Sequence, residues 1–561
     1  MTKGTRRGLK GRLEAASSGA IMIQGTCSDA GKSTLVAGLC RIALQRGFKV
    51  APFKPQNMSN NAAACSEGGE IGRAQAMQAK AAGIAPSVDM NPVLLKPQSD
   101  RTSQVVLQGK ALTTLQAADY MRTRAGLLER VMESFERLRR AFDLVIVEGA
   151  GSAAEINLRT GDIANMGFAR RARLPVCLLG DIDRGGVIAA VVGTRKVLDP
   201  ADAALITRFA INRFRGDPAL FDEGVREMER RTGWPCAGVI PWLDAARRLP
   251  QEDAVIDEAI AYPGASDRGS IPVPKRSCRD RVRIAVPLLS RIANFDDFDP
   301  LRLEPAVDFA FVPPGRPLPR HADVVILPGT KSTIGDLAFL RAQGWDHDLI
   351  AHARSGGRVL GLCGGYQMLG RRVCDPEGID GSPGEVQGLG LLDIETVMGA
   401  EKSVCQVVGK CARSGVILRA YEIHVGVASG PDTRRPFARL MLGLARGGRG
   451  RRQSKAQVAD RPEGAVSADG RIEGTHLHGL FAGDTFRSSW LSRVGSAALS
   501  SLAWEAQMES ALDALAAHIE RSLDVDALFD DAFGVHPARC GPQSIPASET
   551  IEEAIEETIE K

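Results

Sequence analysis

The sequence contains few aromatic residues and carries almost no net charge. Its 561 residues include 18 Phe, 5 Trp and 4 Tyr, and 71 basic side chains nearly balance 67 acidic ones, which leaves a formal charge of +4 at pH 7. So small a charge on so long a chain provides no electrostatic footprint for nucleic acid or for an anionic membrane surface. We therefore expect no nucleic-acid partner.

Long apolar runs and paired cysteines are also lacking. No uninterrupted apolar stretch approaches the roughly 20 residues that span a bilayer. The basic N-terminus, MTKGTRRGLKGRLEAASSG, has no apolar segment of the kind found in secretory signals. The eleven cysteines are scattered, without a CxxC pair or a regular spacing. These absences predict a cytoplasmic protein with reduced thiols and no membrane span.

The chain is long enough for more than one α/β domain. Hydrophobic and charged residues make up 44% and 25%, which is typical of globular proteins, and 561 residues exceed what one core usually supports. From Ala20 onward, apolar strands alternate with glycine turns and amphipathic helices, and a second such series begins at Val282. This alternation predicts mainly parallel sheets. The Pro-, Gly- and Ser-rich residues 262–280 indicate a linker between the two series.

A candidate phosphate-binding loop follows the first strand. Residues 25–34, GTCSDAGKST, lie between an apolar strand and the helical sequence LVAGLCRIALQRG. In a P-loop, glycines let backbone N–H groups converge on phosphate oxygens, the lysine adds a positive charge, and the Ser or Thr hydroxyl binds Mg²⁺. Five residues separate Gly25 from Gly31, one more than usual, so the loop belongs to a variant class. The predicted ATP-binding residues are Gly25, Thr26, Ala30, Gly31, Lys32, Ser33 and Thr34.

Acidic and polar residues follow other strands of the same series. Glu148 ends the apolar run in DLVIVEGAG, and Asp181 follows the run in LPVCLLGDIDRGG. Because parallel strands end at one edge of a sheet, either acid could hold Mg²⁺ together with Ser33, although a single acid after a strand can equally well cap the next helix. The stretch APFKPQNMSNNA adds polar groups at a third strand end, and the residues predicted there to contact substrate or nucleotide are Lys54, Gln56, Asn57 and Ser59.

In the second series, Cys363 lies between an apolar strand and a helix in VLGLCGGYQ, residues 359–367. Its glycine neighbours permit the strained turn of a nucleophile elbow, and a helix N-terminus favours a thiolate and offers N–H groups to an oxyanion. This pattern predicts a thiol that attacks a carboxamide. The turn LPGTKST is a candidate source of a second oxyanion donor. The predicted oxyanion and glutamine-binding residues are Gly329, Thr330, Gly364 and Gln367.

A histidine base for this thiol is expected in GTHLHGLF. This segment contains His476 and His478, and strand alternation places both on one face. The segment YEIHVG, residues 421–426, contributes another histidine, to which the pattern assigns no role.

The motifs together resemble those of the cobyric acid synthase family, whose members hydrolyse glutamine and amidate a corrin ring. The resemblance covers roughly residues 21–491 and rests on GTCSDAGKS, APFKPQNMSNNA, VEGAGSAAEINL, GDIDRGG, LPGTKST, GLCGGYQMLG, YEIHVG and THLHGLF, in that order. It implies a dethiobiotin-synthetase-like P-loop domain followed by a class I glutamine amidotransferase domain of the cobyrinate type. It also implies ATP, Mg²⁺ and glutamine, and amidation of the b, d, e and g carboxylates of adenosylcobyrinic acid a,c-diamide.

The resemblance also bears on the catalytic base. At the position of His476 the family often has Tyr, which makes His478 the better candidate. The usual class I triad ends His-x-Glu, whereas His478 is followed by Gly479 and Leu480, a departure shared by the corrin-amidating branch. The third group of the triad is therefore not identified by the sequence.

Two alternatives stay open. Cobyrinic or hydrogenobyrinic acid a,c-diamide synthases share both domains and amidate other carboxylates of the ring, and residue spacing does not decide between carboxylates. A partitioning-type P-loop switch ATPase fits less well, because that group has an early lysine that GTCSDAG lacks and has no use for a cysteine elbow.

With these motifs placed, the chain divides into five predicted segments. Residues 1–18 are expected to be a disordered N-terminus, 19–261 the ATP-dependent amide synthetase domain, 262–280 the linker, 281–495 the amidotransferase domain, and 496–561 a C-terminal helix with an acidic tail. The helix is predicted from the spacing of Leu512, Leu515, Ile519 and Leu523. The basic tract at 446–452, RGGRGRR, is interpreted as a solvated loop, and the oligomeric state stays open.

Overall fold

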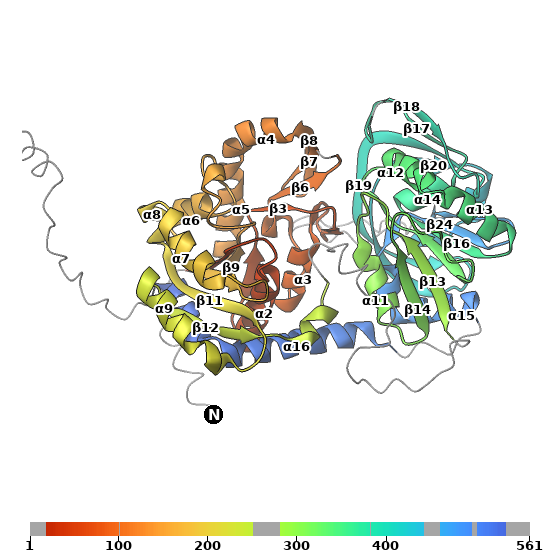
Figure 1. Ribbon diagram of the computed structural model, residues 1–561. Coiled ribbons are helices and arrows are strands. Elements are labelled where there is room, and N and C mark those ends of the chain that lie inside the picture. Colours follow the sequence, from red (N-terminus) through yellow and green to blue (C-terminus); the bar gives the residue numbers. More distant parts are fainter. Residues whose placement is uncertain are drawn as a thin grey trace, which may run out of the picture.

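The structure, a computed structural model, describes residues 18–99, 101–250, 281–381, 383–441, 460–495 and 502–534. The predicted N-terminal segment up to residue 17, the linker at 262–280, the basic tract at 446–452 and the acidic tail lie outside the described residues. The described chain forms two α/β lobes that meet along one side, and a long C-terminal helix runs along the base of the first lobe (Figure 1). The predicted α/β fold with two lobes is confirmed.

The first lobe is built on a parallel sheet of six strands in the order β12-β11-β10-β1-β9-β2. These strands are β1 (Gly19–Gly25), β2 (Val50–Phe53), β9 (Leu144–Glu148), β10 (Val176–Asp181), β11 (Ile206–Phe214) and β12 (Cys236–Pro241). Strands β1, β2, β9 and β10 are buried along their whole length. Continuous apolar runs suit such strands because both faces of the sheet are covered.

Alternate residues of β1 face two apolar cores on opposite sides of this sheet. Met22 belongs to a core with Phe135 and Phe168, whereas Ile23 belongs to a core with Leu39 and Leu515. The helices of the lobe are α2 (Lys32–Gln45), α3 (Arg73–Ala81), α4 (Ala117–Thr123), α5 (Leu128–Ala141), α6 (Met166–Ala172), α7 (Val187–Val197), α8 (Pro200–Ala203) and α9 (Asp222–Thr232).

Smaller strands of the first lobe reach the second lobe. They form a four-stranded sheet in the order β3-β6-β7-β8 and a separate pair β4-β5. Their bounds are β3 (Gln56–Met58), β4 (Ala62–Ala64), β5 (Glu70–Gly72), β6 (Val93–Pro97), β7 (Thr102–Leu107) and β8 (Lys110–Gln116).

The second lobe combines two sheets. One has the order β14-β13-β15-β16-β24-β23 and is parallel except for the last pair. Its strands are β13 (Val282–Pro287), β14 (Val307–Val312), β15 (Val324–Leu327), β16 (Arg358–Leu362), β23 (Ala465–Val466) and β24 (Ile472–Thr475). Its helices are α11 (Asp299–Arg302), α12 (Thr333–Ala342), α13 (Trp345–Arg354), α14 (Gly364–Leu369) and α15 (Asp484–Val494).

The other sheet of this lobe has seven strands and is dominated by the long antiparallel pair β19-β20. Its strands are β17 (Arg372–Asp375), β18 (Gly384–Gln387), β19 (Glu395–Cys411), β20 (Ile417–Ser429), β21 (Ala438–Met441), β22 (Asp460–Glu463) and β25 (Leu477–His478). Strand β20 faces the first lobe, because its Tyr421 and Ile423 share an apolar cluster with Ala62 and Leu94.

A buried charge cluster also joins the lobes. The carboxylate of Glu70, on β5, lies 3.0 Å from Lys96 Nζ and also pairs with Lys402 from β19 of the second lobe. Although burial opposes its ionisation, the charges of Lys402 and Lys96 lower the pKa of Glu70 to about 2. One carboxylate thus compensates two buried cations at the interface.

Glu70→Gln should destabilise the protein by about 3–5 kcal/mol, because it leaves two buried ammonium groups without a counter-charge. Urea unfolding at pH 7 measures this. The pKa of Glu70 lies below its usual value of 4.5. The contribution of this carboxylate to the free energy of unfolding should therefore be complete above pH 4.5 and be lost as the pH falls towards 2. Glu133→Gln, at an exposed residue paired with Arg130 on its own helix, should change stability little, and equal effects of the two substitutions would contradict the interpretation.

The C-terminal segment returns to the first lobe. Helices α16 (Trp504–Ser522) and α17 (Val525–Phe533) complete the core on one face of the first sheet. Helix α16 packs so closely on α2 that a Cβ at Gly38 would lie 2.2 Å from Ile519 Cδ1. Arg41 of α2 pairs with Asp513 at 2.7 Å and with Glu509. The chain therefore crosses from the first lobe to the second and back.

Candidate active site

The predicted phosphate loop connects β1 to α2. Gly31 precedes the helix with φ 91°, and a Cβ there would lie 2.2 Å from Asn212 Nδ2, so only glycine fits. The ammonium group of Lys32, the first residue of α2, donates to the carbonyl oxygens of Cys27 at 3.0 Å and Gly151 at 2.8 Å. The lysine charge is thus held beside the loop. The predicted residues Gly25, Thr26, Ala30, Ser33 and Thr34 belong to the same strand–loop–helix segment.

Glu148 collects several of the predicted residues at the end of β9. Its carboxylate is fully buried and accepts hydrogen bonds from Ser33 Oγ at 2.7 Å, from Lys54 Nζ at 2.8 Å and from Gln78 Nε2 at 2.5 Å. Gln75 Nε2 lies 3.5 Å from the same carboxylate. The hydroxyl and carboxylate oxygens of Ser33 and Glu148 are the kind of donor that Mg²⁺ prefers, so these residues fit the predicted metal ion.

Asp181, the other candidate metal ligand, has different partners. Its carboxylate pairs with Arg213 Nη1 at 2.9 Å and accepts the backbone N–H of Asp183 at 2.9 Å. The contact between Glu148 and Ser33 therefore favours Glu148 as the acid at the P-loop.

A cavity of about 680 Å³ opens beside the phosphate loop. It suits a nucleotide or part of a large substrate. Lys32, Lys54, Gln56 and Asn57 line it together with residues of the segment that follows β9. Ser59, the fourth predicted contact residue of that stretch, is buried and accepts the N–H of Asn61 at 3.1 Å instead.

Cys363 occupies a strained turn between β16 and α14. Its backbone adopts φ 50° and ψ −111°, a conformation that residues other than glycine rarely adopt and that is expected of a nucleophile elbow. A Cβ at Gly364 would lie 2.6 Å from Thr330 Cγ2, and one at Gly365 would lie 2.3 Å from Leu327 O. The glycines thus allow the turn to pack directly against the neighbouring strand end.

His478 lies beside Cys363 and is oriented by Asp297. His478 Nδ1 is 2.7 Å from Asp297 Oδ2, and the N–H of Gly479 donates to Asp297 Oδ1 at 2.6 Å. The side chains of His478 and Asp297 are only 2% and 3% exposed. Burial disfavours the imidazolium, but the charge of Asp297 and the hydrogen bonds to Asp297 and Cys363 raise the pKa of His478 to about 10. The imidazolium form of His478 is therefore favoured near neutral pH.

The turn after β15 closes this site on a third side. A Cβ at Gly329 would lie 3.1 Å from His478 Cε1 and 3.6 Å from Cys363 Cβ, so this glycine borders both side chains. The next residue, Thr330, is anchored by donation to Arg291 O at 3.0 Å. Gln367 is held by the protein itself, because its amide accepts from Thr333 Oγ1 at 3.0 Å and donates to Val425 O at 2.9 Å.

His476 has partners unlike those of His478. Its ring stacks on His424 at 3.9 Å between centroids and meets the ring of Tyr366 at 4.9 Å, and its Nδ1 lies 3.4 Å from Glu463 Oε1. The predicted common strand face does not occur, because residue 476 falls between β24 and β25.

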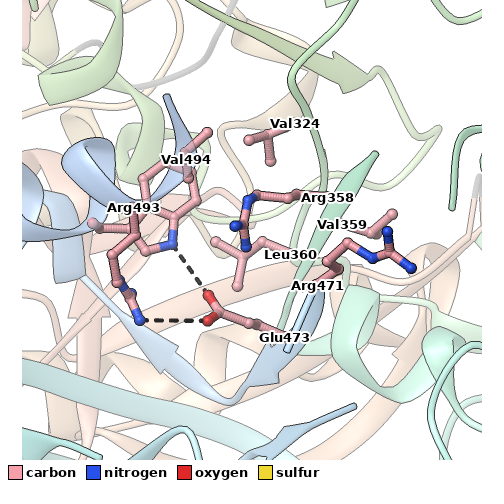
Figure 2. Close-up of a pocket in the computed structure, with 9 residues that line it drawn as sticks. Val324, Arg358, Val359, Leu360, Arg471, Glu473, Arg493 and Val494 are labelled. Atoms are coloured by element: carbon pink, nitrogen blue, oxygen red, sulfur yellow. Dashed lines mark hydrogen bonds and ion pairs between the residues drawn. The ribbon is translucent and has the colours of Figure 1, made fainter. Parts of the chain in front are cut away.

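Cys363 follows the C-terminal end of β16. A small notch of about 10 Å³ lies at the other end of this strand, where β15, β16 and β24 begin, and its lining residues are drawn in Figure 2. Glu473 fills one side of it, 3.3 Å from Trp490 Nε1 and 3.6 Å from Arg493 Nη1. A space of this size holds about one water molecule. It is too small for a substrate.

Comparison with known proteins decides the family. The profile of the CobQ/CobB/MinD/ParA nucleotide binding domain matches residues 21–256, and that of the CobB/CobQ-like glutamine amidotransferase domain matches residues 283–486. The cobyric acid synthase of Hyphomonas neptunium is 60% identical over 91% of this chain and 97% of its own length. The chain belongs to the cobyric acid synthase family. Cobyric acid synthases of Paracoccus denitrificans and Cereibacter sphaeroides are 58% and 57% identical, each over 91% of this chain and over 99% and 98% of their own lengths.

For this member of the cobyric acid synthase family, Asp297 is the residue that the sequence did not reveal. It lies 181 positions before His478, in the acidic run NFDDFD that follows the first strand of the second lobe. The available signal was weak: several carboxylates in an otherwise apolar segment. Among the described residues, no helix is long and apolar enough to cross a bilayer.

Asp297→Asn should lower the rate of glutamate release from glutamine on the order of a hundredfold. The amide supplies no charge for the imidazolium and can favour the wrong histidine tautomer. Steady-state assays with glutamine measure this, and amide synthesis from ammonium salts in the same variant serves as a control for folding. Asp308→Asn, at an exposed residue of β14, should retain the wild-type rate. A normal rate in Asp297→Asn would remove this residue from the triad.

Proposed function

We propose that the chain is an ATP-dependent carbon–nitrogen ligase that amidates the b, d, e and g carboxylates of adenosylcobyrinic acid a,c-diamide with ammonia from glutamine. The observation that carries this proposal is the pairing, in one chain, of the Cys363–His478–Asp297 arrangement with a P-loop beside a large cavity. The names of relatives that match over nearly their whole length support the same activity.

The first half-reaction releases ammonia. The thiolate of Cys363 attacks the side-chain carboxamide of glutamine, and His478 protonates the departing ammonia. The N–H of Gly364 and the turn at Gly329 and Thr330 stabilise the oxyanion. Water then hydrolyses the glutamyl thioester, with His478 as the base, and glutamate leaves.

The second half-reaction activates the ring. Lys32 and the loop amides stabilise the charge of the γ-phosphoryl group as it moves from ATP to a substrate carboxylate. Ammonia from the other lobe then displaces phosphate from the acyl phosphate to form the amide. Ser33 and Glu148 would hold Mg²⁺, which supplies further positive charge to the phosphate oxygens.

The alternatives differ in substrate. An a,c-diamide synthase would amidate the a and c carboxylates of the same ring. The relatives' names favour the later reaction. A P-loop switch ATPase leaves the Cys363–His478–Asp297 arrangement without a purpose. The described residues include nine cysteines, all of them free thiols, which fits the cytoplasm as the site of the reaction.

Mass spectrometry of the products tests this function. Purified protein, ATP, Mg²⁺ and glutamine should convert the a,c-diamide to the hexa-amide, with four new amides. Conversion of cobyrinic acid to the a,c-diamide alone would favour the alternative, and failure to amidate either ring would refute the ligase. Because the sequence has one P-loop and one cysteine elbow, tri-, tetra- and penta-amides should appear first under limiting glutamine.

A further inference from the structure

The turn that presents Asp297 is held by the first lobe. Asp297 lies in a short 3₁₀ helix, Phe295–Phe298, which is preceded by Asn294 in the left-handed conformation, with φ 54°. The N–H of Asn294 donates to Asn61 Oδ1 at 2.8 Å, and Asn294 Oδ1 accepts the N–H of Ala62 at 3.0 Å. Asn61 and Ala62 belong to the first lobe, so the start of the turn is fixed from across the interface.

A second contact comes from Arg73, the first residue of α3. Its Nε lies 2.8 Å from Oδ2 of Asp296, the neighbour of Asp297, and the Asp296 side chain is only 3% exposed. The guanidinium also lies 6.0 Å from the ring centroid of Tyr421, and that ring stacks on His478 at 5.4 Å between centroids. Arg73 therefore lies next to two neighbours of the His478–Asp297 pair, the carboxylate of Asp296 and the ring of Tyr421.

The positive charge of Arg73 offsets the negative charge of the carboxylates near His478. Asp296 and Asp297 are adjacent buried carboxylates. Burial and the charge of Asp297 raise the pKa of Asp296, whereas the charge of Arg73 opposes the rise. Without Arg73, Asp296 would have to become protonated or turn towards water, and either change would disturb the turn that carries Asp297.

Other residues of the first lobe, which we propose to be the synthetase lobe, hold Arg73 in place. Its N–H donates to Asn61 O at 3.0 Å. Further along α3, Gln75 accepts a hydrogen bond from Asn57 at 2.9 Å, and Gln78 donates to Glu148. The helix is therefore anchored in the nucleotide site, and the position of its first residue follows from that anchoring.

We infer that Arg73, a residue of the synthetase lobe, is a positioning residue of the glutaminase: it holds Asp296, and through it the turn that directs Asp297 onto His478. Arg73 acts through these groups and is not itself a catalytic residue. The inference rests on the proposed function of Cys363, His478 and Asp297.

Arg73→Met in the full chain tests the inference. The rate constant kcat for glutamate release should fall about tenfold, because a displaced base slows proton transfer. The KM for glutamine should stay within about twofold, since Arg73 affects the orientation of His478 and not the pocket that binds glutamine. Amide synthesis from ammonium should also stay within about twofold. Arg73→Lys, which keeps the cation, should recover part of kcat, and Arg122→Met, at an exposed arginine paired with Asp119 on its own helix, should match the wild type.

A double-mutant cycle with Asp296→Asn adds a second readout. If Arg73 acts through Asp296, the double variant should lose little more activity than the more damaging single variant. Unchanged kcat in Arg73→Met, additive losses in the cycle, or an equal loss of ammonium-supported synthesis would overturn the inference. A wild-type protein that releases no glutamate refutes the proposed function and this inference together, whereas a Cys363-dependent glutaminase that does not depend on Arg73 refutes this inference alone.

Discussion

Cys363→Ala should lower glutamine-supported amide synthesis by about four orders of magnitude or more, while synthesis from ammonium salts continues. The thioester cannot form without the thiol, and loss of a nucleophile costs nearly all of the covalent pathway. Because we propose that carboxylate activation takes place in the other lobe, at Lys32 and Glu148, external ammonia should still be used. The variant should therefore lose the use of glutamine as a nitrogen source and keep the use of ammonium.

The measurement is product mass with glutamine and with ammonium chloride in parallel. Cys374→Ala is the matched control, because Cys374 is a half-buried free thiol in the same lobe. Glutamine-dependent synthesis that survives in Cys363→Ala would show that another group attacks glutamine. Loss of both glutamine-supported and ammonium-supported synthesis would contradict the separation of the two half-reactions, because it would mean that carboxylate activation also depends on Cys363.

Lys32→Ala should lower synthesis from either nitrogen source by about a thousandfold or more. The ammonium group of Lys32 lies beside the phosphate loop, 3.0 Å from Cys27 O and 2.8 Å from Gly151 O. Without its charge, phosphoryl transfer to the carboxylate loses a principal electrostatic contribution. No supply of ammonia replaces that step.

Glutamate release gives the internal control for this variant, since the Cys363 site lies in the other lobe and should keep working. Lys49→Ala, at an exposed lysine of the same lobe, should behave as the wild type. Rescue of Lys32→Ala by high ammonium would mean that the lysine serves glutamine use rather than carboxylate activation. In that case the assignment of the phosphate site would be wrong.

Features with a local signature could be predicted from the sequence. A strand, a glycine turn and a helix adjoin one another at both Lys32 and Cys363, so a few consecutive residues specify each turn and its chemistry. The rule that parallel strands end at one edge of a sheet predicted an acid near Ser33 but left Glu148 and Asp181 as alternatives. The order of the strands in the sheet was not predicted. How these residues act in catalysis stays a prediction for the assays above.

Features built by distant contacts could not be predicted. Asp297 becomes a partner of His478 only because the short 3₁₀ helix Phe295–Phe298 contacts the segment Leu480–Ala482 that follows β25. Nothing in NFDDFD singles out one carboxylate among its neighbours. His476 was expected to share a face with His478, but alternation holds only within a continuous strand, and the strand is interrupted at residue 476. The leucine spacing after residue 510 indicated a helix but not the surface that it covers.

The return of α16 and α17 to the first lobe has a consequence for how the chain is made. The apolar face of α2, with Leu39 and its neighbours, is covered by residues that are translated more than 450 positions later. Synthesis on the ribosome proceeds from the N-terminus, and each domain usually folds as it emerges. Here the first core to be translated is the last to be closed. A nascent chain leaves this apolar surface uncovered until α16 and α17 have left the exit tunnel, so a message truncated after the second lobe should yield a product that is prone to aggregate.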